Sequence, residues 1–188
     1  MKHTFLKRTL RFVPICLIFL TACENEPKES KEIAKEQNEQ KFTKAGEKDA
    51  EFVVDATSSS YNEVSIAEVA LSKSTNAEIK KMAAELKNDH SAIINELKKV
   101  GESKSISMPV AATEDAMEEA KDLNEKKAKD FDKAWLSEVK TMHEKSVKKY
   151  EDASANATDA DIKTWAGTTL VKIRSHLDMI VQMENKMK

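Results

Sequence analysis

The chain contains few residues that interrupt regular structure, with 3 glycines and 3 prolines among its 188 residues. Sandwiches, barrels and glycine-looped nucleotide folds need many tight turns, so this composition disfavours those fold classes. Aromatic residues make up only 5% of the chain, whereas Ala, Glu, Lys, Leu and Met are plentiful. Because these five are good helix formers, the composition predicts an all-α fold.

Neither sign of charge is in clear excess, since 31 Lys and Arg residues stand against 33 Asp and Glu residues. The formal net charge is -2, and no contiguous basic stripe appears along the chain. Proteins that bind nucleic acid need a basic surface to neutralise phosphates. The sequence therefore predicts no nucleic-acid partner.

Cysteine is scarce as well, and both cysteines, Cys16 and Cys23, lie near the N-terminus. Residues 2–11 carry four basic side chains and no acid, and residues 12–20 are almost wholly apolar. This order is typical of a secretory signal, and the apolar run is too short to remain as a membrane span. The run ends in Leu20-Thr21-Ala22-Cys23, which resembles the lipobox of bacterial lipoproteins, where the cysteine thiol receives a diacylglycerol. An ordinary cleaved signal with an incidental cysteine is the alternative.

The lipobox predicts three parts of the chain: a lipoprotein signal peptide at 1–22, a lipidated Cys23 with a polar tether at 23–47, and a folded domain at 48–188. Processing would leave 27 basic against 33 acidic residues, a formal charge of -6, and no second thiol for a disulfide. The membrane would then be a partner through the lipid at Cys23. We expect a location in the bacterial cell envelope, with the domain in the periplasm or on the outer surface.

Apolar residues recur at helical spacing in four long segments, at about 48–72, 76–100, 129–153 and 159–187. A short acidic helix is expected at about 114–126, inside the one long connection. Gly101 is expected to end the second long helix, and Thr158 with Asp161 resembles a capping box at the start of the last one. The pattern predicts an antiparallel ferritin-like four-helix bundle with a short extra helix between long helices two and three.

Ionisable residues interrupt these apolar stripes in every long segment. The residues at stripe positions are Glu63, His90, Asp132, His143 and His176. Measured from an end assumed to hold both short turns, Glu63, His143 and His90 lie at roughly 16–24 Å, His176 at about 30 Å and Asp132 near 36 Å. These heights allow one cluster, or a central trio with a second pair made of Asp132 and His176.

Imidazole and carboxylate groups together are ligands that Zn, Fe, Mn or Cu accept, and helical bundles hold metals in this way. The sequence thus marks Glu63, His90, His143 and His176 as candidate ligands of a transition metal, the cofactor otherwise being unknown. The alternative is a metal-free polar network in which Glu63 accepts hydrogen bonds from His90 or His143. The paired Glu-x-x-His signature of di-iron bundles is absent, because the residues three before the histidines are Lys87, Lys140 and Ile173.

Several of these residues also carry a resemblance to a known family. The matching motifs are Glu63-Val64 with Ile66 and Ala70, Lys80 with Ala83, Asp89-His90, Phe131-Asp132, Trp135-Leu136, His143, and Leu170 through His176-Leu177. Over about 49–183 the chain resembles the ferritin-like domain of unknown function 4142. The resemblance implies an envelope-located four-helix bundle, and it adds Asp89 and Asp132 as polar positions that would support the ligands. The chain departs from the family pattern at Trp135, where Tyr is usual, and at Leu170-Val171, where Leu-Pro is usual.

Two functions remain open from the sequence. In one, the protein is a non-enzymatic envelope lipoprotein of the outer membrane or periplasm that binds an envelope protein or supports stress tolerance. In the other, the core binds a transition metal for storage, sensing or redox chemistry. No catalytic residue is predicted: Ser91 beside His90, and Ser175 beside His176, point in different directions on their helices and form no nucleophile–base pair.

Overall fold

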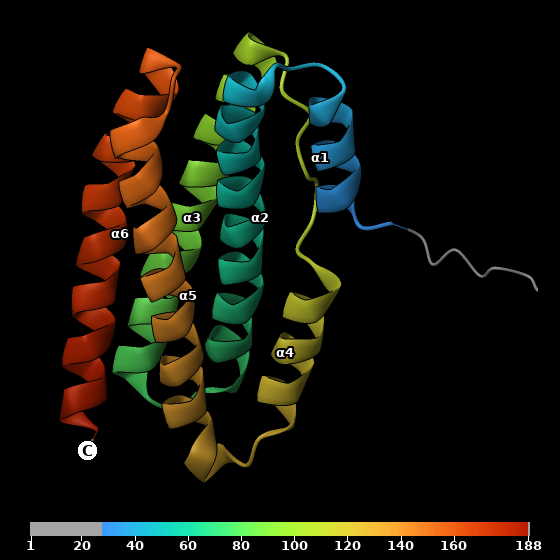
Figure 1. The fold of residues 1–188 in the computed structure, drawn as a ribbon. Helices are drawn as coiled ribbons and strands as arrows, with labels where there is room; N and C mark the ends of the chain where they lie inside the picture. The colour runs from blue at the N-terminus through green and yellow to red at the C-terminus, as the bar shows by residue number, and fades with distance from the viewer. Residues whose placement is uncertain (1–27, 188) are drawn as a thin grey trace, which may run out of the picture.

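The computed structural model describes residues 28–187, so the predicted signal peptide and Cys23 lie outside the described residues. Over this range it contains six helices and no strand (Figure 1). They are α1 (Ser30–Glu39), α2 (Lys44–Lys73), α3 (Ala77–Lys104), α4 (Glu114–Glu125), α5 (Ala128–Asn156) and α6 (Ala160–Lys186). The predicted all-α fold is confirmed, with α4 as the short helix in the long connection. None of the helices in 28–187 is both long enough and apolar enough to cross a bilayer.

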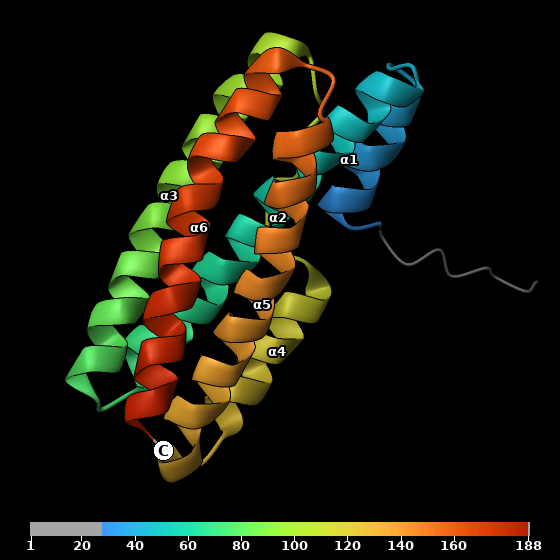
Figure 2. The ribbon, with the colours of Figure 1, turned by 60° about the vertical axis from the view of Figure 1, so that its left-hand side comes forward.

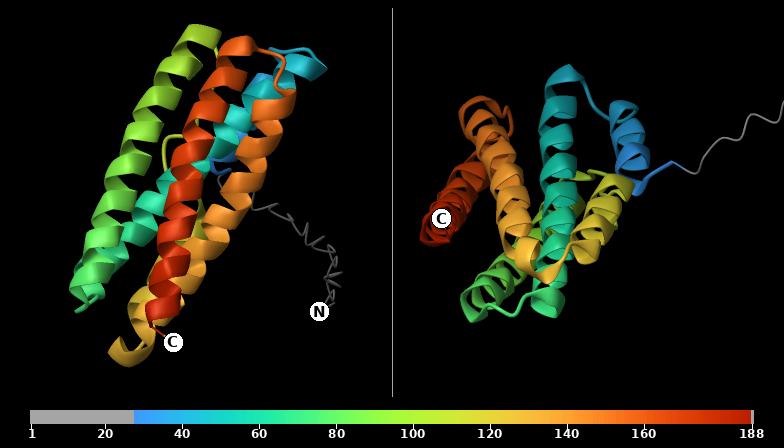
Figure 3. Two further views of the ribbon diagram at one scale, coloured as in Figure 1. Left: turned by 90° about the vertical axis from the view of Figure 1, so that its left-hand side faces the viewer. Right: turned by 90° about the horizontal axis from the view of Figure 1, so that it is seen from below.

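The four long helices, α2, α3, α5 and α6, alternate in direction and form one antiparallel bundle (Figure 1). Helix α2 packs against α3 and α5, and α5 packs against α6. Helix α6 lies beside α3 (Figure 2), where Lys172 Nζ is 2.8 Å from Asp89 Oδ1. Helix α4 lies outside this square, against α2 and α5 (Figure 3).

The two short connections lie at opposite ends of the bundle, whereas the height estimate assumed a single shared end. Residues 74–76 join α2 to α3 at the lower end in Figure 1, and residues 157–159 join α5 to α6 at the upper end. The reason is the long connection, which carries the chain from the upper end of α3 down through α4 to the start of α5. The predicted heights of the polar residues were therefore wrong.

Residues 30–39 form helix α1 and are not part of an unstructured tether. The side chain of Asn38 is buried and pairs with the backbone of Ser107 in both directions, donating over 2.9 Å and accepting over 2.7 Å. Lys35 Nζ also lies 3.1 Å from Asp55 Oδ1 of α2. These contacts attach a mostly polar segment to the bundle, so the folded part begins before residue 48.

Helix α3 does not end at Gly101 as predicted. It continues to Lys104, and Ser105 takes the left-handed conformation with a φ of 58°. Gly101 instead leaves room for Met108, because a Cβ at position 101 would lie 2.7 Å from Met108 Cγ and would displace that side chain. The missing side chain allows the segment after α3 to fold back over the helix.

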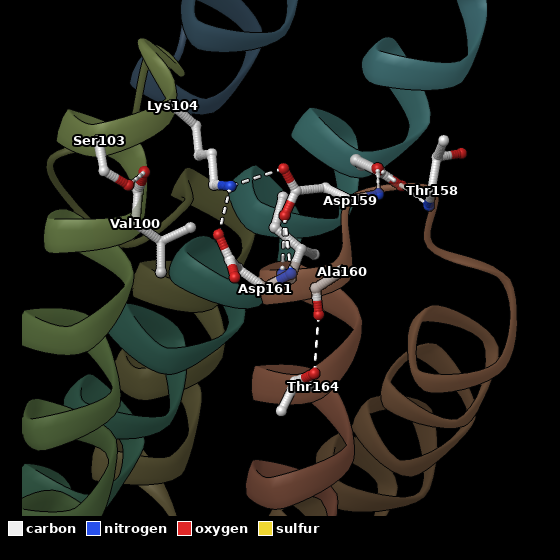
Figure 4. A network of polar contacts seen from close by, with 10 residues as sticks. Val100, Ser103, Lys104, Thr158, Asp159, Ala160, Asp161 and Thr164 are labelled. Atoms are coloured by element: carbon white, nitrogen blue, oxygen red, sulfur yellow. Dashed lines mark hydrogen bonds and ion pairs between the residues drawn. The ribbon is translucent and has the colours of Figure 1, made fainter.

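An ion-pair network ties the end of α3 to the start of α6 (Figure 4). Lys104 Nζ lies 2.6 Å from Asp159 Oδ2 and 2.7 Å from Asp161 Oδ2. Asp159 also caps α6, since its Oδ1 accepts the Asp161 N–H over 3.0 Å. Thr158, the predicted cap, instead donates its N–H to the Asp49 carboxylate at 3.0 Å.

The buried apolar side chains form two clusters along the bundle axis. The upper cluster includes Val53, Leu97, Tyr150 and Ile173. The lower cluster includes Ile66, Leu86, Trp135 and Ile180. On every long helix the two clusters are separated by a turn that carries an ionisable residue, so the core consists of two apolar parts with a polar level between them.

Candidate metal centre

One ionisable side chain from each long helix occupies the level between the two apolar clusters. These residues, called the polar layer below, are Glu63 of α2, His90 of α3, His143 of α5 and His176 of α6. Their exposed fractions are 2% or less. Each lies three or four residues from buried apolar side chains of its own helix, and this helical spacing turns it into the core.

The levels of these residues agree once the antiparallel order is taken into account. Glu63 and His176 lie ten residues before the lower ends of α2 and α6, and His90 and His143 lie 13 and 15 residues after the lower ends of α3 and α5. At 1.5 Å per residue all four are about 15–22 Å from that end, whereas Asp132 is at about 6 Å. The single-cluster alternative therefore describes Glu63 and the three histidines.

The three imidazole rings contact one another. Their centroids are 5.4 Å apart for His90 and His143, 5.5 Å for His90 and His176, and 5.4 Å for His143 and His176. One ring nitrogen from each residue lies within 4.8 Å of the other two. The bundle thus brings three nitrogen ligands from three helices to one buried point.

The hydrogen bonds of His143 and His176 determine which of their nitrogens face each other. His143 Nδ1 lies 2.7 Å from the Val139 carbonyl oxygen, which can only accept, so Nδ1 carries the proton. His176 Nε2 lies 2.9 Å from Asp89 Oδ2 and donates to that carboxylate. The remaining nitrogens, His143 Nε2 and His176 Nδ1, are 3.4 Å apart. In two neutral imidazoles this places two lone pairs opposite each other with no proton between them.

For His90, too, the hydrogen bonds show which ring nitrogen carries the proton. Its Nδ1 lies 3.4 Å from Ser60 Oγ, and that hydroxyl donates its own proton to the Ala56 carbonyl over 2.9 Å. Nδ1 is therefore the donor, and Nε2 is left as the acceptor. Among the described residues, no group makes a hydrogen bond to His90 Nε2.

Glu63 is a buried carboxyl group without a hydrogen-bond partner within residues 28–187, at either Oε1 or Oε2. Oε2 lies 3.3 Å from His143 Nδ1 and 4.0 Å from His90 Nε2. The predicted metal-free network needs Glu63 to accept a hydrogen bond from His90 or His143. Both histidines lie near Glu63, but neither contact has the geometry of a hydrogen bond. An unpartnered buried carboxylate is costly, so this group is either protonated or stabilised by a cation.

Burial decides the protonation of Glu63, His90 and His143. It raises the pKa of Glu63 well above its usual value, and nearby Glu138 raises it further. Burial lowers the pKa of His90 well below the usual range, with His143 and His176 adding to the effect. Burial lowers the pKa of His143 to about 4, against the hydrogen bond to Val139. Both of these histidines are therefore neutral near pH 7, with lone pairs available for a metal.

Asp89, predicted to support the ligands, contacts His176 as described above. Partial burial opposes ionisation of Asp89, but Lys172, whose Nζ lies 2.8 Å from Oδ1, and His176 together lower its pKa. An ionised Asp89 fixes the tautomer and orientation of His176. Carboxylate–histidine pairs of this kind accompany metal-ligating histidines in general.

Asp132 does not join the polar layer, and the predicted pair of Asp132 with His176 is wrong. Its Oδ1 accepts a hydrogen bond from Ser74 Oγ over 2.7 Å, at the lower end of the bundle. Asp132 begins α5 while His176 lies in the middle of α6, so the antiparallel order separates them. Its contact supports the connection between α2 and α3.

Several supporting groups were missed by the sequence reasoning. Lys172 lies four residues before His176, on the same face of α6, and this spacing was a usable signal. Ser60 lies three residues before Glu63, also on one helix face. The Val139 carbonyl has no signal in the sequence, because every residue carries the same backbone group.

A comparison with protein-family models matches residues 34–183 to the model described as a domain of unknown function (DUF4142). Neither the curated proteins nor the solved structures contain a match. The match starts inside α1, in agreement with the packing of α1 against the bundle, and it extends through all four residues of the polar layer to Met183 near the end of α6. The family model thus covers most of the 188 residues, and the chain belongs to the DUF4142 family.

Proposed function

We propose that this protein is a lipid-anchored protein of the bacterial cell envelope whose bundle binds one transition-metal ion in the polar layer. His90, His143 and His176 would supply nitrogen ligands, and Glu63 would supply a carboxylate. The observation that carries the proposal is the 3.4 Å approach of His143 Nε2 to His176 Nδ1, while the other nitrogen of each ring faces an acceptor of its own.

A cation between these two nitrogens removes the repulsion of their lone pairs. A proton on His143 Nε2 is disfavoured near pH 7, because burial lowers the pKa of His143 to about 4. A metal ion fits the spacing better. Two nitrogens at about 2.0–2.1 Å from a tetrahedral zinc ion are roughly 3.3–3.4 Å apart. The observed separation of 3.4 Å agrees with this spacing and supports the proposal.

The outer side of each imidazole supports the same proposal. Each ring has its second nitrogen directed to a protein acceptor: Ser60 for His90, Val139 for His143 and Asp89 for His176. Such outer partners orient metal-ligating histidines and raise their basicity. Three nitrogens suit Zn, Fe, Mn and Cu. Glu63, whose Oε2 lies 4.0 Å from His90 Nε2, is proposed as the oxygen ligand beside them.

The test is direct metal analysis of the full chain, solubilised in detergent and purified with a tag free of histidine. After loading with Zn²⁺, Mn²⁺, Fe²⁺ or Cu²⁺ and dialysis, we expect about one equivalent of at least one metal, and less after His90→Ala or His143→Ala. Circular dichroism would check that each variant is folded. Absence of a stoichiometric metal, or unchanged binding by both folded variants, would leave the metal-free structural network as the role of these residues.

Asp89→Asn is expected to weaken binding of that metal by roughly 10–100-fold, because the amide cannot hold His176 as an ionised carboxylate does. Isothermal titration would measure the affinity. Asp132→Asn is the matched control, since it changes the same functional group at the lower end of the bundle and should leave the affinity unchanged. Equal effects of the two substitutions would contradict the supporting role of Asp89.

The anchor gives a separate prediction. Cys23→Ser is expected to shift the protein from the membrane to the soluble fraction of the envelope, because a serine hydroxyl is not the thiol that receives the lipid. Cell fractionation and labelling with a radioactive fatty acid would measure this. Cys16→Ser is the control within the same segment and should retain both lipid and membrane association. Fatty-acid labelling of the Cys23→Ser variant would refute the assignment.

A further inference from the structure

The polar layer is bordered by a groove between α2, α4 and α5. This groove has a volume of about 460 Å³, and Glu63 is one of its lining residues. It also contains three further acidic side chains, Asp115 and Glu119 of α4 and Glu138 of α5. Figures 1 and 3 show α4 forming the outer wall, on the side of the bundle away from α3 and α6.

We propose that metal ions reach the polar layer through this groove, passing from Glu119 to Glu138 and then to Glu63. The inference rests on the proposed function, since it describes how the metal of that site enters. A second observation, made on Glu63, indicates that the acidic groove serves a cation. Glu63 lines the groove and is only 1% exposed. Neither of its carboxyl oxygens has a hydrogen-bond partner among the described residues.

The three carboxyl groups lie at two depths: Glu119 and Glu138 are both half-buried, and Glu63 is buried. All three line this one groove. Like charges held near one another favour a cation between them. A hydrated metal ion could therefore exchange its waters for carboxylate oxygens stepwise.

Three lysines also line the groove, and two of them are engaged by a neighbouring acid. Lys149 Nζ lies 2.8 Å from Asp55 Oδ2, and Lys31 Nζ lies 3.1 Å from Asp55 Oδ1. The third, Lys145, lowers the pKa of Glu138 and is the one that opposes cation entry at this step. Ion pairing with Asp55 reduces the positive charge that Lys149 and Lys31 present to the groove.

The outer wall is fixed to the bundle by its first turn. The Thr113 N–H donates to Asn62 Oδ1 over 2.9 Å, and Asn62 Nδ2 donates to Thr113 Oγ1 over 3.1 Å. Thr113 is also the N-cap of α4, and Asn62 directly precedes Glu63 in α2. This pairing sets the distance of α4 from the metal site.

Stopped-flow loading of the full chain with Co²⁺ alone tests the route, because the visible absorption of Co²⁺ changes when it gains nitrogen ligands. The double variant Glu119→Gln/Glu138→Gln is expected to slow loading at least tenfold at low salt, an effect of the size expected for electrostatic steering. Its equilibrium affinity should change by less than about threefold, since neither residue is a proposed ligand. The rate difference should shrink as salt is added.

The matched control is Glu78→Gln/Glu85→Gln, which removes the same charge from a groove between α3 and α6. Loading of this control at the wild-type rate would support the route. Equal slowing of both double variants, or no slowing of either, would overturn it while leaving the metal site intact. If the wild-type chain shows no Co²⁺ absorption change at any concentration and no metal by analysis, the proposed function itself fails.

Discussion

Replacing Trp135 with alanine is expected to lower the free energy of unfolding by about 3–5 kcal/mol. Trp135 is the largest fully buried side chain and lies in the lower apolar cluster with Leu86 and Ile180. Its indole N–H also donates to the Ile66 carbonyl over 3.0 Å, which ties α5 to α2. Alanine would leave a large cavity between packed helices and remove this hydrogen bond. Urea unfolding followed by circular dichroism would measure the loss.

Trp165→Ala is the control for the size of the side chain. Trp165 is only partly buried; it contacts Phe52 and Tyr150, and its indole N–H donates to Glu96 at the surface over 2.9 Å. Because the removed ring leaves less of a closed cavity, the expected loss is clearly smaller than that of Trp135→Ala. Similar losses for the two variants would show that the lower cluster can collapse around the missing ring.

Glu63→Gln is expected to stabilise the metal-free protein increasingly as the pH rises. The folded pKa of Glu63 is raised by burial, so the folded state retains a proton that the unfolded state has lost. Above the unfolded pKa near 4.3, the wild-type protein therefore loses about 1.4 kcal/mol per pH unit until the folded pKa is passed. Glutamine does not titrate. The advantage of the glutamine variant should therefore grow as the pH is raised from 5 towards the folded pKa of Glu63.

Chemical unfolding at several pH values in the presence of a chelator would measure this trend. Glu144→Gln, which alters an exposed carboxyl group next to His143 in the sequence, is the matched control for the loss of a carboxyl group. A difference between Glu63→Gln and wild type that does not change with pH would mean that Glu63 is ionised in the folded protein. Bound metal should reverse the trend, because a ligating carboxylate must be ionised.

In the same experiment, His90 and His143 make the free energy of unfolding depend on pH in the opposite direction to Glu63. Burial lowers the folded pKa of His143 to about 4 and also lowers that of His90, so the unfolded state binds more protons in the range from about 6.5 down to 4. Their contribution to stability is present above pH 6.5 and is lost as the pH falls toward the folded pKa. Wild type and Glu63→Gln both retain these histidines, so both should lose this contribution on acidification.

Much of the candidate site was predictable because helical periodicity is a strong local signal. Glu63, His90, His143 and His176 each interrupt an apolar stripe, and a residue at a stripe position must face the core whatever the neighbouring helices do. Asp132 satisfied the same rule and still belongs elsewhere. Periodicity fixes the face of a helix but carries no information on its height relative to another helix.

Helix α1 shows the complementary limit. Residues 30–39 bury little apolar surface, and low hydrophobicity argues against order. The segment packs because Asn38 pairs with the Ser107 backbone and Lys35 pairs with Asp55, partners that lie 69 and 20 residues further along the chain. Long-range polar pairs of this kind have no local pattern.

The sequence by itself determined the four long helices and α4, their buried faces, the ionisable residues at their stripe positions and the family of the chain. Scarcity of glycine and proline favoured long helices, because a chain with few turn-forming residues disfavours folds with many tight turns. The tertiary structure decided which polar residues meet. Since the long connection reverses the end from which α5 begins, the three histidines and Glu63 lie at one level, Asp132 lies at another, and the acidic groove beside Glu63 exists only because α4 packs across α2 and α5.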